Sequence, residues 1–155
     1  MFEPIRRSIH VGRTPEDAFR LFTERIDDWW PTETLSRTAD GEFGDGVKLE
    51  RVVFEPAQGG RIYEVTSDGR EAPWAEILVY DPPRRLVLAW KPNDRDQPPT
   101  EVEVRFEADG DGTRLDLEHS GWARLGDLAT EARKGYSAGW QLPLARYAAA
   151  ATTAG

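Results

Sequence analysis

Six short segments rich in β-branched and aromatic residues follow one another between residues 47 and 120, and no helical pattern lies between them. Turn signals built from Gly, Pro, Asp and Ser separate them. The segments are 47–54, 61–66, 74–80, 86–90, 101–107 and 113–119. Strands joined by short turns without an intervening helix pair in antiparallel fashion. The run therefore predicts a meandering antiparallel sheet, and this feature restricts the possible folds more than any other.

The fifth segment shows the clearest alternation of apolar and charged residues. Its apolar positions are Val102, Val104 and Phe106, and its charged positions are Glu101, Glu103, Arg105 and Glu107. Successive side chains of a strand point to opposite faces of the sheet. The pattern predicts one dry face and one face in contact with water.

The N-terminal part of the chain predicts a further strand followed by a helix. Residues 4–11 alternate, with one arginine interrupting the apolar positions, which is typical of a half-buried strand. Thr14 suits an N-cap and Pro15 the first helical position. The amphipathic pattern that follows predicts a helix ending near 29–31, and residues 31–46 have the composition of a long loop.

Residues 125–150 predict a long C-terminal helix that Pro143 kinks or interrupts. Its apolar stripe consists of Leu128, Ala132, Tyr136, Trp140, Leu144 and Tyr147. A sheet with one dry face and an amphipathic helix pack against each other. We therefore expect an α+β helix-grip fold, in which a seven-stranded curved sheet wraps this helix with a hollow between them. Residues 1–155 are expected to form one such domain.

Composition excludes several classes of function. Lys and Arg number 20 and Asp and Glu 28, so the net charge of −8 argues against binding to nucleic acid or to an anionic membrane. The absence of cysteine excludes disulfides and thiol chemistry, and two histidines leave little room for a metal site. We expect no metal and no cofactor. No apolar segment approaches membrane-spanning length and residues 1–7 precede no apolar stretch, so we expect a cytoplasmic protein.

Several fragments, in this order and spacing, carry a resemblance to a known superfamily. They are Thr14–Phe19, Trp29-Trp30, Glu55–Arg61, Asp81–Trp90, Asp111–Leu115, Glu118–Trp122 and Gly139-Trp140. The set resembles the SRPBCC superfamily, which includes START domains, birch-pollen-allergen-like proteins and polyketide cyclases. Within it the chain is most similar to bacterial homologues of the heat-shock-protein-90 ATPase activator family. The resemblance implies an internal cavity between sheet and helix and carries over no catalytic residue.

Six residues are candidates for binding a ligand in that hollow. They are Trp90, Phe106, Leu117, His119, Tyr136 and Trp140. The apolar members share the dry face of their strand or the helix stripe, as the walls of a pocket do. His119 shares the face of its strand with Leu117, so it could serve as a polar anchor. The alternative for the five apolar and aromatic residues is ordinary core packing. The alternative for His119 is a structural histidine that is hydrogen-bonded to the backbone.

Three further features have two interpretations each. At most one of the adjacent Trp29 and Trp30 is expected to be fully buried, while the other guards a cavity mouth or a dimer contact, or staples the short helix. Glu64 or Glu76 could face inward as a general acid, but a solvated charge is expected for both. The stretch 109–113 resembles a calcium loop but predicts a hairpin turn, because it sits between two strands.

The leading hypothesis is a binding protein, rather than an enzyme, for a small hydrophobic or aromatic molecule of unknown identity. A cyclase or dehydratase is the alternative, and it requires a second titratable group within about 3 Å of His119 or of a shared substrate atom. A chaperone-interacting module is a third possibility, and it requires an exposed patch. The sequence leaves a homodimer and a chaperone partner open.

Overall fold

A computed structural model describes residues 2–152 and shows seven strands in one sheet. The strands are β1 Ile5–Val11, β2 Leu49–Phe54, β3 Arg61–Thr66, β4 Glu71–Asp81, β5 Arg85–Trp90, β6 Thr100–Asp109 and β7 Gly112–Ser120. Their order across the sheet is β1-β7-β6-β5-β4-β3-β2, and every neighbouring pair is antiparallel. The predicted meander and the seventh strand are confirmed.

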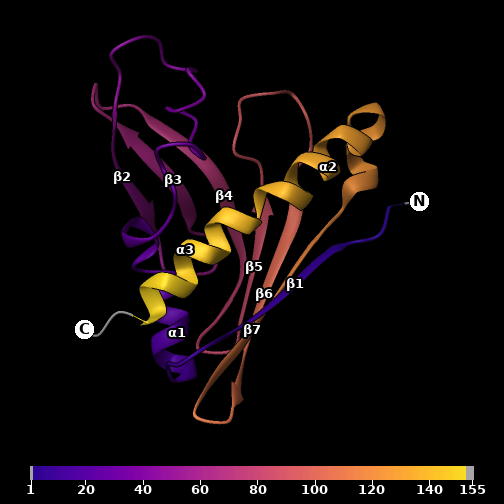
Figure 1. Cartoon of the computed structure of the whole chain (residues 1–155). Helices are drawn as coiled ribbons and strands as arrows, with labels where there is room; N and C mark the ends of the chain where they lie inside the picture. The colour runs from indigo at the N-terminus through magenta and orange to yellow at the C-terminus, as the bar shows by residue number, and fades with distance from the viewer. Residues whose placement is uncertain (1, 153–155) are drawn as a thin grey trace.

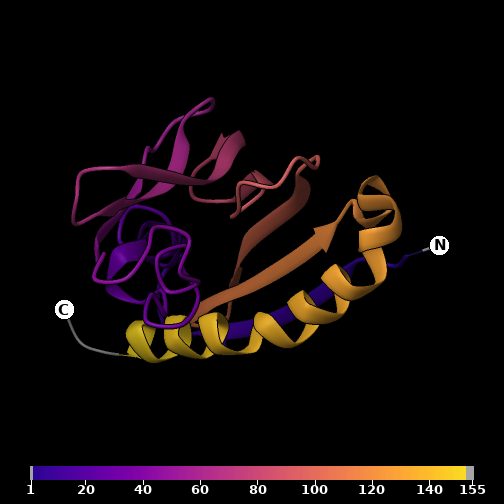
Figure 2. The ribbon, with the colours of Figure 1, turned by 90° about the horizontal axis from the view of Figure 1, so that it is seen from above.

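Three α-helices and two 3-10 segments complete the fold. They are α1 Pro15–Phe22, η1 Ile26–Asp28, η2 Trp122–Leu128, α2 Ala129–Gly139 and α3 Gln141–Thr152. The helices α2 and α3 follow each other across the concave side of the curled sheet (Figure 1). Seen from above, the sheet curls around them (Figure 2). The predicted α+β helix-grip fold is confirmed.

Helix α1 begins as the sequence predicts but ends earlier. The Thr14 hydroxyl accepts a hydrogen bond from the Asp17 backbone N–H at 3.2 Å, and Pro15 is the first helical residue. The helix ends at Phe22 because the next residue, Thr23, leaves helical geometry and donates its hydroxyl to the Phe19 carbonyl at 2.7 Å. The prediction of one helix reaching 29–31 is therefore wrong.

The C-terminal helix is interrupted, as the proline predicts, but the break lies at Trp140 between α2 and α3. Pro143 lies in the first turn of α3, where its missing N–H leaves no hydrogen bond unmade. Residues 122–128 form a 3-10 segment instead of the first turns of the helix, and Gly126 within it has φ +56°. These two breaks bend the C-terminal segment along the sheet.

One half of the space between sheet and helix is filled by α1. Phe19 and Phe22 lie with ring centroids 5.1 and 5.8 Å from that of Phe106 on β6. The ring of Tyr147 on α3 lies 5.4 Å from that of Phe22, and its hydroxyl donates to the Ala18 carbonyl at 2.7 Å. This half is a packed aromatic core.

Two arginines at β1 hold the C-terminal helices against the sheet. Arg7 donates to the Ser137 carbonyl of α2 at 2.8 Å, and Arg13 donates to the Ala151 carbonyl near the end of α3 at 2.9 Å. Arg7 is the residue that interrupts the apolar face of β1. Its guanidinium therefore supplies a hydrogen-bond donor to a carbonyl of helix α2.

The β6–β7 connection is a tight hairpin in which Asp109 pairs with Gly112, so the predicted turn is confirmed. Within residues 2–152 no group of acidic residues and histidines is arranged to hold a metal ion. No helix in the same range is long and apolar enough to cross a membrane.

Candidate functional site

A cavity of about 470 Å³ occupies the other half of the space between sheet and helix. Its wall consists of side chains from the loop after η1, from β4 and β5, from the segment after β5, from the first residue of β6, and from η2, α2 and the start of α3. Those residues are Trp30, Thr34, Leu35, Ser36, Arg37, Asp40, Trp74, Trp90, Lys91, Pro92, Asn93, Arg95, Gln97, Thr100, Leu125, Leu128, Glu131, Ala132, Gly135, Tyr136, Gly139, Trp140 and Pro143. The volume is in the range of small-molecule sites.

Four tryptophans form the aromatic part of this wall. The ring of Trp30 lies 5.3 Å from that of Trp74, 5.9 Å from that of Trp90 and 6.1 Å from that of Trp140. Trp90 also lies 5.8 Å from Trp140. All four are at least nine-tenths buried. The four rings are therefore held rigidly by their contacts with one another and with the rest of the protein.

Three of the four indole N–H groups already donate to an acceptor in the protein. The acceptors are Leu35 O for Trp30 at 2.7 Å, Glu64 Oε1 for Trp74 at 2.7 Å and His119 Nδ1 for Trp140 at 3.0 Å. The N–H of Trp90 has no hydrogen-bond partner among the described residues. The Trp90 indole is therefore the one of these four whose N–H is not fixed by a hydrogen bond of good geometry.

His119 lies behind the cavity wall and supports it. Because Nδ1 accepts from Trp140, the ring proton is on Nε2, which contacts the Thr100 hydroxyl at 2.7 Å. That hydroxyl in turn donates to the Trp90 carbonyl at 3.3 Å. Burial lowers the pKa of His119 to about 3, so its imidazole is neutral near pH 7. No titratable side chain is among its hydrogen-bond partners.

The six candidate residues fall into two groups. Trp90, Tyr136 and Trp140 line the cavity. Phe106, Leu117 and His119 lie outside its wall. Phe106 is covered by α1, Leu117 is buried in β7 where it pairs with Val104, and His119 has the support position described above. Ligand binding by any of the six stays a prediction.

Trp29 is buried in the packed half, while Trp30, which is 8% exposed, lines the cavity, in agreement with the expectation that at most one of the two is fully buried. They follow a 3-10 segment instead of lying on an α-helix, and Trp29 has φ −130°. The Trp29 N–H donates to the Leu21 carbonyl at 2.8 Å, which fixes it on the packed side, while Trp30 turns to the cavity. The change of backbone geometry allows both rings to point inward.

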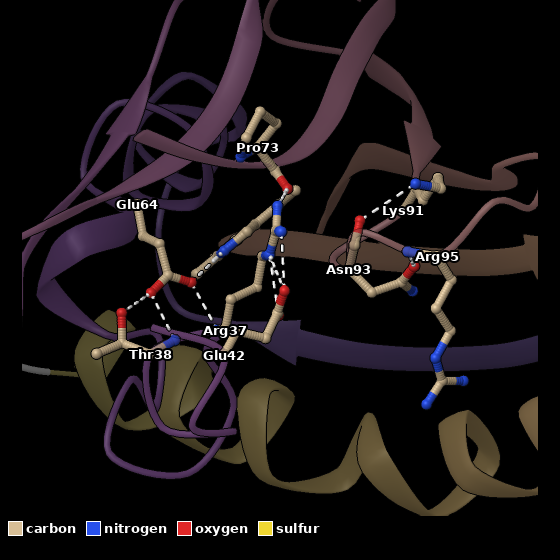
Figure 3. Close-up of polar contacts among 9 residues, drawn as sticks. Arg37, Thr38, Glu42, Glu64, Pro73, Lys91, Asn93 and Arg95 are labelled. Carbon is tan, nitrogen blue, oxygen red and sulfur yellow. Dashed lines mark hydrogen bonds and ion pairs between the residues drawn. The ribbon is translucent and has the colours of Figure 1, made fainter. Parts of the chain in front are cut away.

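The expectation of a solvated charge is wrong for Glu64 and is confirmed for Glu76, which is exposed. Glu64 is fully buried, and its carboxylate accepts from the backbone N–H groups of Arg37 at 2.7 Å and Thr38 at 2.9 Å (Figure 3). It also accepts from the Thr38 hydroxyl and from the Trp74 indole at 2.7 Å. Four donors satisfy the buried charge and fasten the loop 31–46 to the sheet.

The same loop is held by a second polar contact. The guanidinium of Arg37 makes an ion pair with Glu42 at 2.9 Å and donates to the Pro73 carbonyl of β4 at 3.0 Å (Figure 3). Sequence reasoning missed this loop as part of the site. A buried glutamate that faces a distant loop has no local sequence signal, because its partners lie 26 and 27 residues away.

The mouth of the cavity carries charges of both signs. Lys91 donates to the Asn93 carbonyl at 3.2 Å, and the Arg95 side chain is directed away from both (Figure 3). Asp40 and Glu131 contribute negative charge. Partial burial, with help from nearby carboxylates, raises the pKa of Asp40, while Arg95 opposes that rise.

Tyr136 on α2 lines the cavity, and its ring packs against those of His119 and Trp122. Burial is the largest effect on its hydroxyl and raises its pKa, while the Trp90 indole and Arg95 lower it. The Trp90 N–H thus lies in electrostatic reach of the Tyr136 oxygen, although the two do not meet hydrogen-bond geometry. The hydroxyl is protonated at neutral pH and can donate to a ligand.

A curled seven-stranded sheet that encloses a cavity against a C-terminal helix defines the SRPBCC class of helix-grip proteins. The chain belongs to the family described as "Activator of Hsp90 ATPase homolog 1-like protein", whose model matches residues 13–150. The fold and the family match both confirm the resemblance carried by the sequence fragments.

Two solved structures share more than a quarter of their residues with this chain. An anthrahydroquino-γ-pyrone synthase, Txn09, complexed with SUM, is 34% identical with a TM-score of 0.62, covering 95% of this chain and 96% of that one. The self-sacrificing resistance protein CalC from Micromonospora echinospora is 29% identical with a TM-score of 0.67, covering 96% and 93%.

A third structure, protein CV1439 from Chromobacterium violaceum, is 18% identical with a TM-score of 0.66, covering 99% of this chain and all of that one, and it supports the fold alone. No curated protein matches the chain.

Proposed function

We propose that this protein binds a fused-ring aromatic molecule of polyketide type in the cavity between sheet and helix. The observation that carries the proposal is the wall of four indoles around a space of about 470 Å³. Flat aromatic surfaces at several angles enclose a rigid ring system better than they enclose a flexible chain, because a rigid ligand loses little conformational entropy on binding.

Two similar structures bear on the ligand class, and the name of one of them agrees with it. One is the synthase of an anthrahydroquino-γ-pyrone, which is a fused-ring product, and it is 34% identical to this chain over nearly its whole length. The other is named a self-sacrificing resistance protein, and that name states no ligand. Both share the fold in which the cavity lies, so the same location is the natural site for a ligand here.

The first test is direct binding of two tricyclic probes, xanthone and xanthene, measured by equilibrium dialysis. We expect saturable binding of both at one site per chain. Tyr136→Ala removes an aromatic wall from the cavity and is expected to weaken both affinities about tenfold.

Tyr63→Ala is the matched control, because the Tyr63 ring stacks on Arg61 outside the cavity. It should leave both affinities unchanged. Absence of saturable binding by either tricyclic probe would contradict the proposed function, as would equal losses in the two tyrosine variants. Saturable binding of palmitate alone would point to an acyl chain and would also contradict it.

An enzyme of cyclase type is the second candidate, because a similar structure is a synthase and two titratable side chains, Asp40 and Tyr136, line the cavity. His119 is not suited to move a proton here, since its ring contacts a hydroxyl and an indole and its pKa is about 3. Asp40, with its raised pKa, is the better general base.

The test for this candidate is to incubate the protein with a poly-β-keto aromatic precursor and follow loss of one water by mass spectrometry. Turnover that Asp40→Asn abolishes, while the dialysis affinity of xanthone is retained, would establish the enzyme. If the wild-type protein leaves the precursor unchanged, the enzyme is excluded and only the binding function remains.

A chaperone-interacting module requires an exposed patch. The exposed large apolar side chains of the described residues are Phe2, Leu78, Leu128 and Leu142, which lie in four separate parts of the chain. Single exposed apolar side chains are normal for a protein surface. They give no specific support to this third possibility.

A further inference from the structure

The hydroxyl of Tyr136 is held among residues that line the cavity. The tyrosine itself lines the cavity, and its ring packs against those of His119 and Trp122 at centroid distances of 4.8 and 5.7 Å. These contacts fix the ring and therefore the place of the hydroxyl at its far end. The side chains that act electrostatically on this hydroxyl also line the cavity. They are Trp90, Arg95 and Asp40.

The proton of the Tyr136 hydroxyl has no acceptor in the part of the chain that the structure describes. Within residues 2–152, the buried side-chain polar atom that lacks both a partner and surface open to water is Trp90 Nε1. The Tyr136 oxygen is not of that kind, so it keeps surface that water can reach. Because the side chain lines the cavity, that surface is open to a ligand there.

Trp90 determines which role the tyrosine oxygen has left. Burial raises the pKa of Tyr136, and the Trp90 N–H opposes that rise by acting as a donor toward the oxygen. An indole N–H only donates, so the tyrosine oxygen is the accepting partner in this pair. The O–H proton remains for a different acceptor, and a hydroxyl whose oxygen already accepts is the stronger donor.

Helix α2 leaves open space on both sides of Tyr136. Gly135 precedes it and Gly139 lies three residues further along, and both line the cavity. A Cβ atom added at either glycine would meet nothing within 4 Å. Alanine would therefore fit at both positions and would favour the helix, yet neither position carries a side chain. A ring system that approaches the Tyr136 hydroxyl meets no side chain from these two positions.

The charges around the hydroxyl do not select an anion. Beyond the effect of burial, Arg95 lowers the pKa of Tyr136 and Asp40 raises it, so the two charges act on the same oxygen in opposite directions. Lys91 and Glu131 add one charge of each sign to the lining of the cavity. A neutral acceptor suits this balance, and a carbonyl oxygen on a ring system has lone pairs without a charge.

We propose that the ligand of this cavity carries a neutral carbonyl oxygen on its fused-ring system, and that this oxygen accepts a hydrogen bond from the Tyr136 hydroxyl. Trp90 is a positioning residue, because its N–H occupies the accepting side of the tyrosine oxygen and leaves the proton for the ligand. The inference rests on the proposed function and deepens it, since it names the polar group of the ligand and the residue that recognises it.

The decisive experiment compares xanthone with xanthene in the wild-type protein and in Tyr136→Phe by equilibrium dialysis. The two probes have the same three fused rings, and only xanthone has a carbonyl on the central ring. We expect the wild-type protein to bind xanthone about fivefold more tightly than xanthene. Tyr136→Phe keeps the ring and removes the hydroxyl, so it should lose that preference and bind xanthene about as tightly as the wild-type protein does.

Tyr63→Phe is the matched control, because it removes a hydroxyl outside the cavity and should keep the preference. Equal affinity of the wild-type protein for the two probes would overturn this inference and leave the proposed function intact. A preference that survives in Tyr136→Phe would also overturn it. Binding of neither probe would overturn the proposed function itself.

The role of Trp90 is tested by a pair of tryptophan variants. Trp90→Phe removes the donor to the tyrosine oxygen and should reduce the preference for xanthone. Trp30→Phe loses the same ring surface from the same cavity, but its N–H donates to the Leu35 carbonyl, so it should weaken both probes and keep the preference. An equal preference in the two variants would show that Trp90 does not position the hydroxyl.

The carbonyl stretch of bound xanthone gives a direct second measurement. A hydrogen bond from a hydroxyl lowers the frequency of a C=O stretch, and infrared difference spectra of xanthone labelled with ¹³C at the carbonyl isolate that band. We expect a lower frequency in the wild-type complex than in the Tyr136→Phe complex. The same frequency in both saturated complexes would show that the hydroxyl does not reach the carbonyl, and the inference would fail.

Discussion

His119 is fully buried, and both of its ring nitrogens have partners. Protonation would place a second hydrogen where Nδ1 accepts from Trp140 and would charge a ring that water cannot reach. Burial accordingly holds its pKa at about 3, against an ordinary value of 6.5. The residue is a neutral support that orients a cavity wall. Because its imidazole stays neutral in the folded protein, the stability of the protein depends on pH.

Between pH 6.5 and about 3, the unfolded chain binds a proton at this residue that the folded chain does not bind. The free energy of unfolding therefore falls as pH is lowered across this window, by about 1.4 kcal/mol per pH unit from this group at most. We expect His119→Gln to remove that contribution, so that urea titrations of the variant from pH 6.5 to 4 show a shallower dependence on pH.

His10→Gln serves as the control, because the His10 side chain is about half exposed. Its pH dependence should follow that of the wild-type protein. Parallel profiles for the wild-type protein and His119→Gln would contradict the assignment of a neutral, buried imidazole.

Residue-level patterns predicted the facing of side chains on regular strands and little beyond that. The alternation in 101–107 correctly placed Phe106 and Val104 on the dry face. It could not show that Phe106 would be covered by Phe19, because that depends on where α1 rests on the sheet. A side chain can therefore be predicted to face inward without any indication of whether it faces a packed core or a hollow.

At the scale of elements, the loop 31–46 behaves as a structured wall of the cavity. It has no regular secondary structure, so it is held by side-chain contacts instead of a backbone ladder. Glu64 on β3 accepts from two of its backbone N–H groups and from one hydroxyl, and also from the indole of Trp74 on β4. One carboxylate thereby joins a loop, two strands and the cavity.

Glu64→Gln should loosen this loop and destabilise the protein. An amide keeps one oxygen but brings an NH₂ group against donors that need acceptors, so we expect a loss of about 2–4 kcal/mol in the free energy of unfolding. The urea midpoint at pH 7 measures the loss. Xanthone affinity should also fall, because the loop supplies Leu35, which accepts from Trp30.

Glu76→Gln provides the same chemical change at an exposed position on the neighbouring strand β4. Its urea midpoint should lie close to that of the wild-type protein, as is usual for exposed charges. If Glu64→Gln and Glu76→Gln unfold at the same urea concentration, the buried carboxylate does not hold the loop.

The elements themselves were largely predictable, and their ends were less so. Strand positions followed from alternation and turn residues, and the break in the C-terminal helix from Pro143. The early end of α1 depends on the Thr23 hydroxyl competing for a helix carbonyl. The contribution of the loop 31–46 depends on contacts between residues far apart in sequence, which a single sequence does not reveal.

At the scale of the whole molecule, the cavity lies between the two parts that must stay together for the fold to exist. Trp90 belongs to the sheet and Trp140 to the break between the two C-terminal helices. A ligand that contacts both joins them more firmly. Unfolding separates these walls and destroys the site, so binding and folding are thermodynamically linked.

Xanthone at one hundred times its dissociation constant should therefore raise the free energy of unfolding by about 2.7 kcal/mol. Differential scanning calorimetry with and without the probe measures the accompanying rise in Tm. Tyr136→Ala should need a correspondingly higher concentration for the same rise. An affinity found by dialysis with no change in Tm would mean that the unfolded chain binds the probe as well as the folded chain does, so that binding does not need the assembled cavity.

The close approach of Trp30, Trp74, Trp90 and Trp140 has an optical consequence. With ring centroids 5.3 to 6.4 Å apart for the pairs in contact, the electronic transitions of these indoles couple, and excitation energy can pass from one ring to the next. Near-ultraviolet circular dichroism and intrinsic fluorescence then report on the cluster as a unit, and replacing any one ring alters the signal of all four. The protein thus carries a built-in spectroscopic reporter at the place where a ligand would arrive.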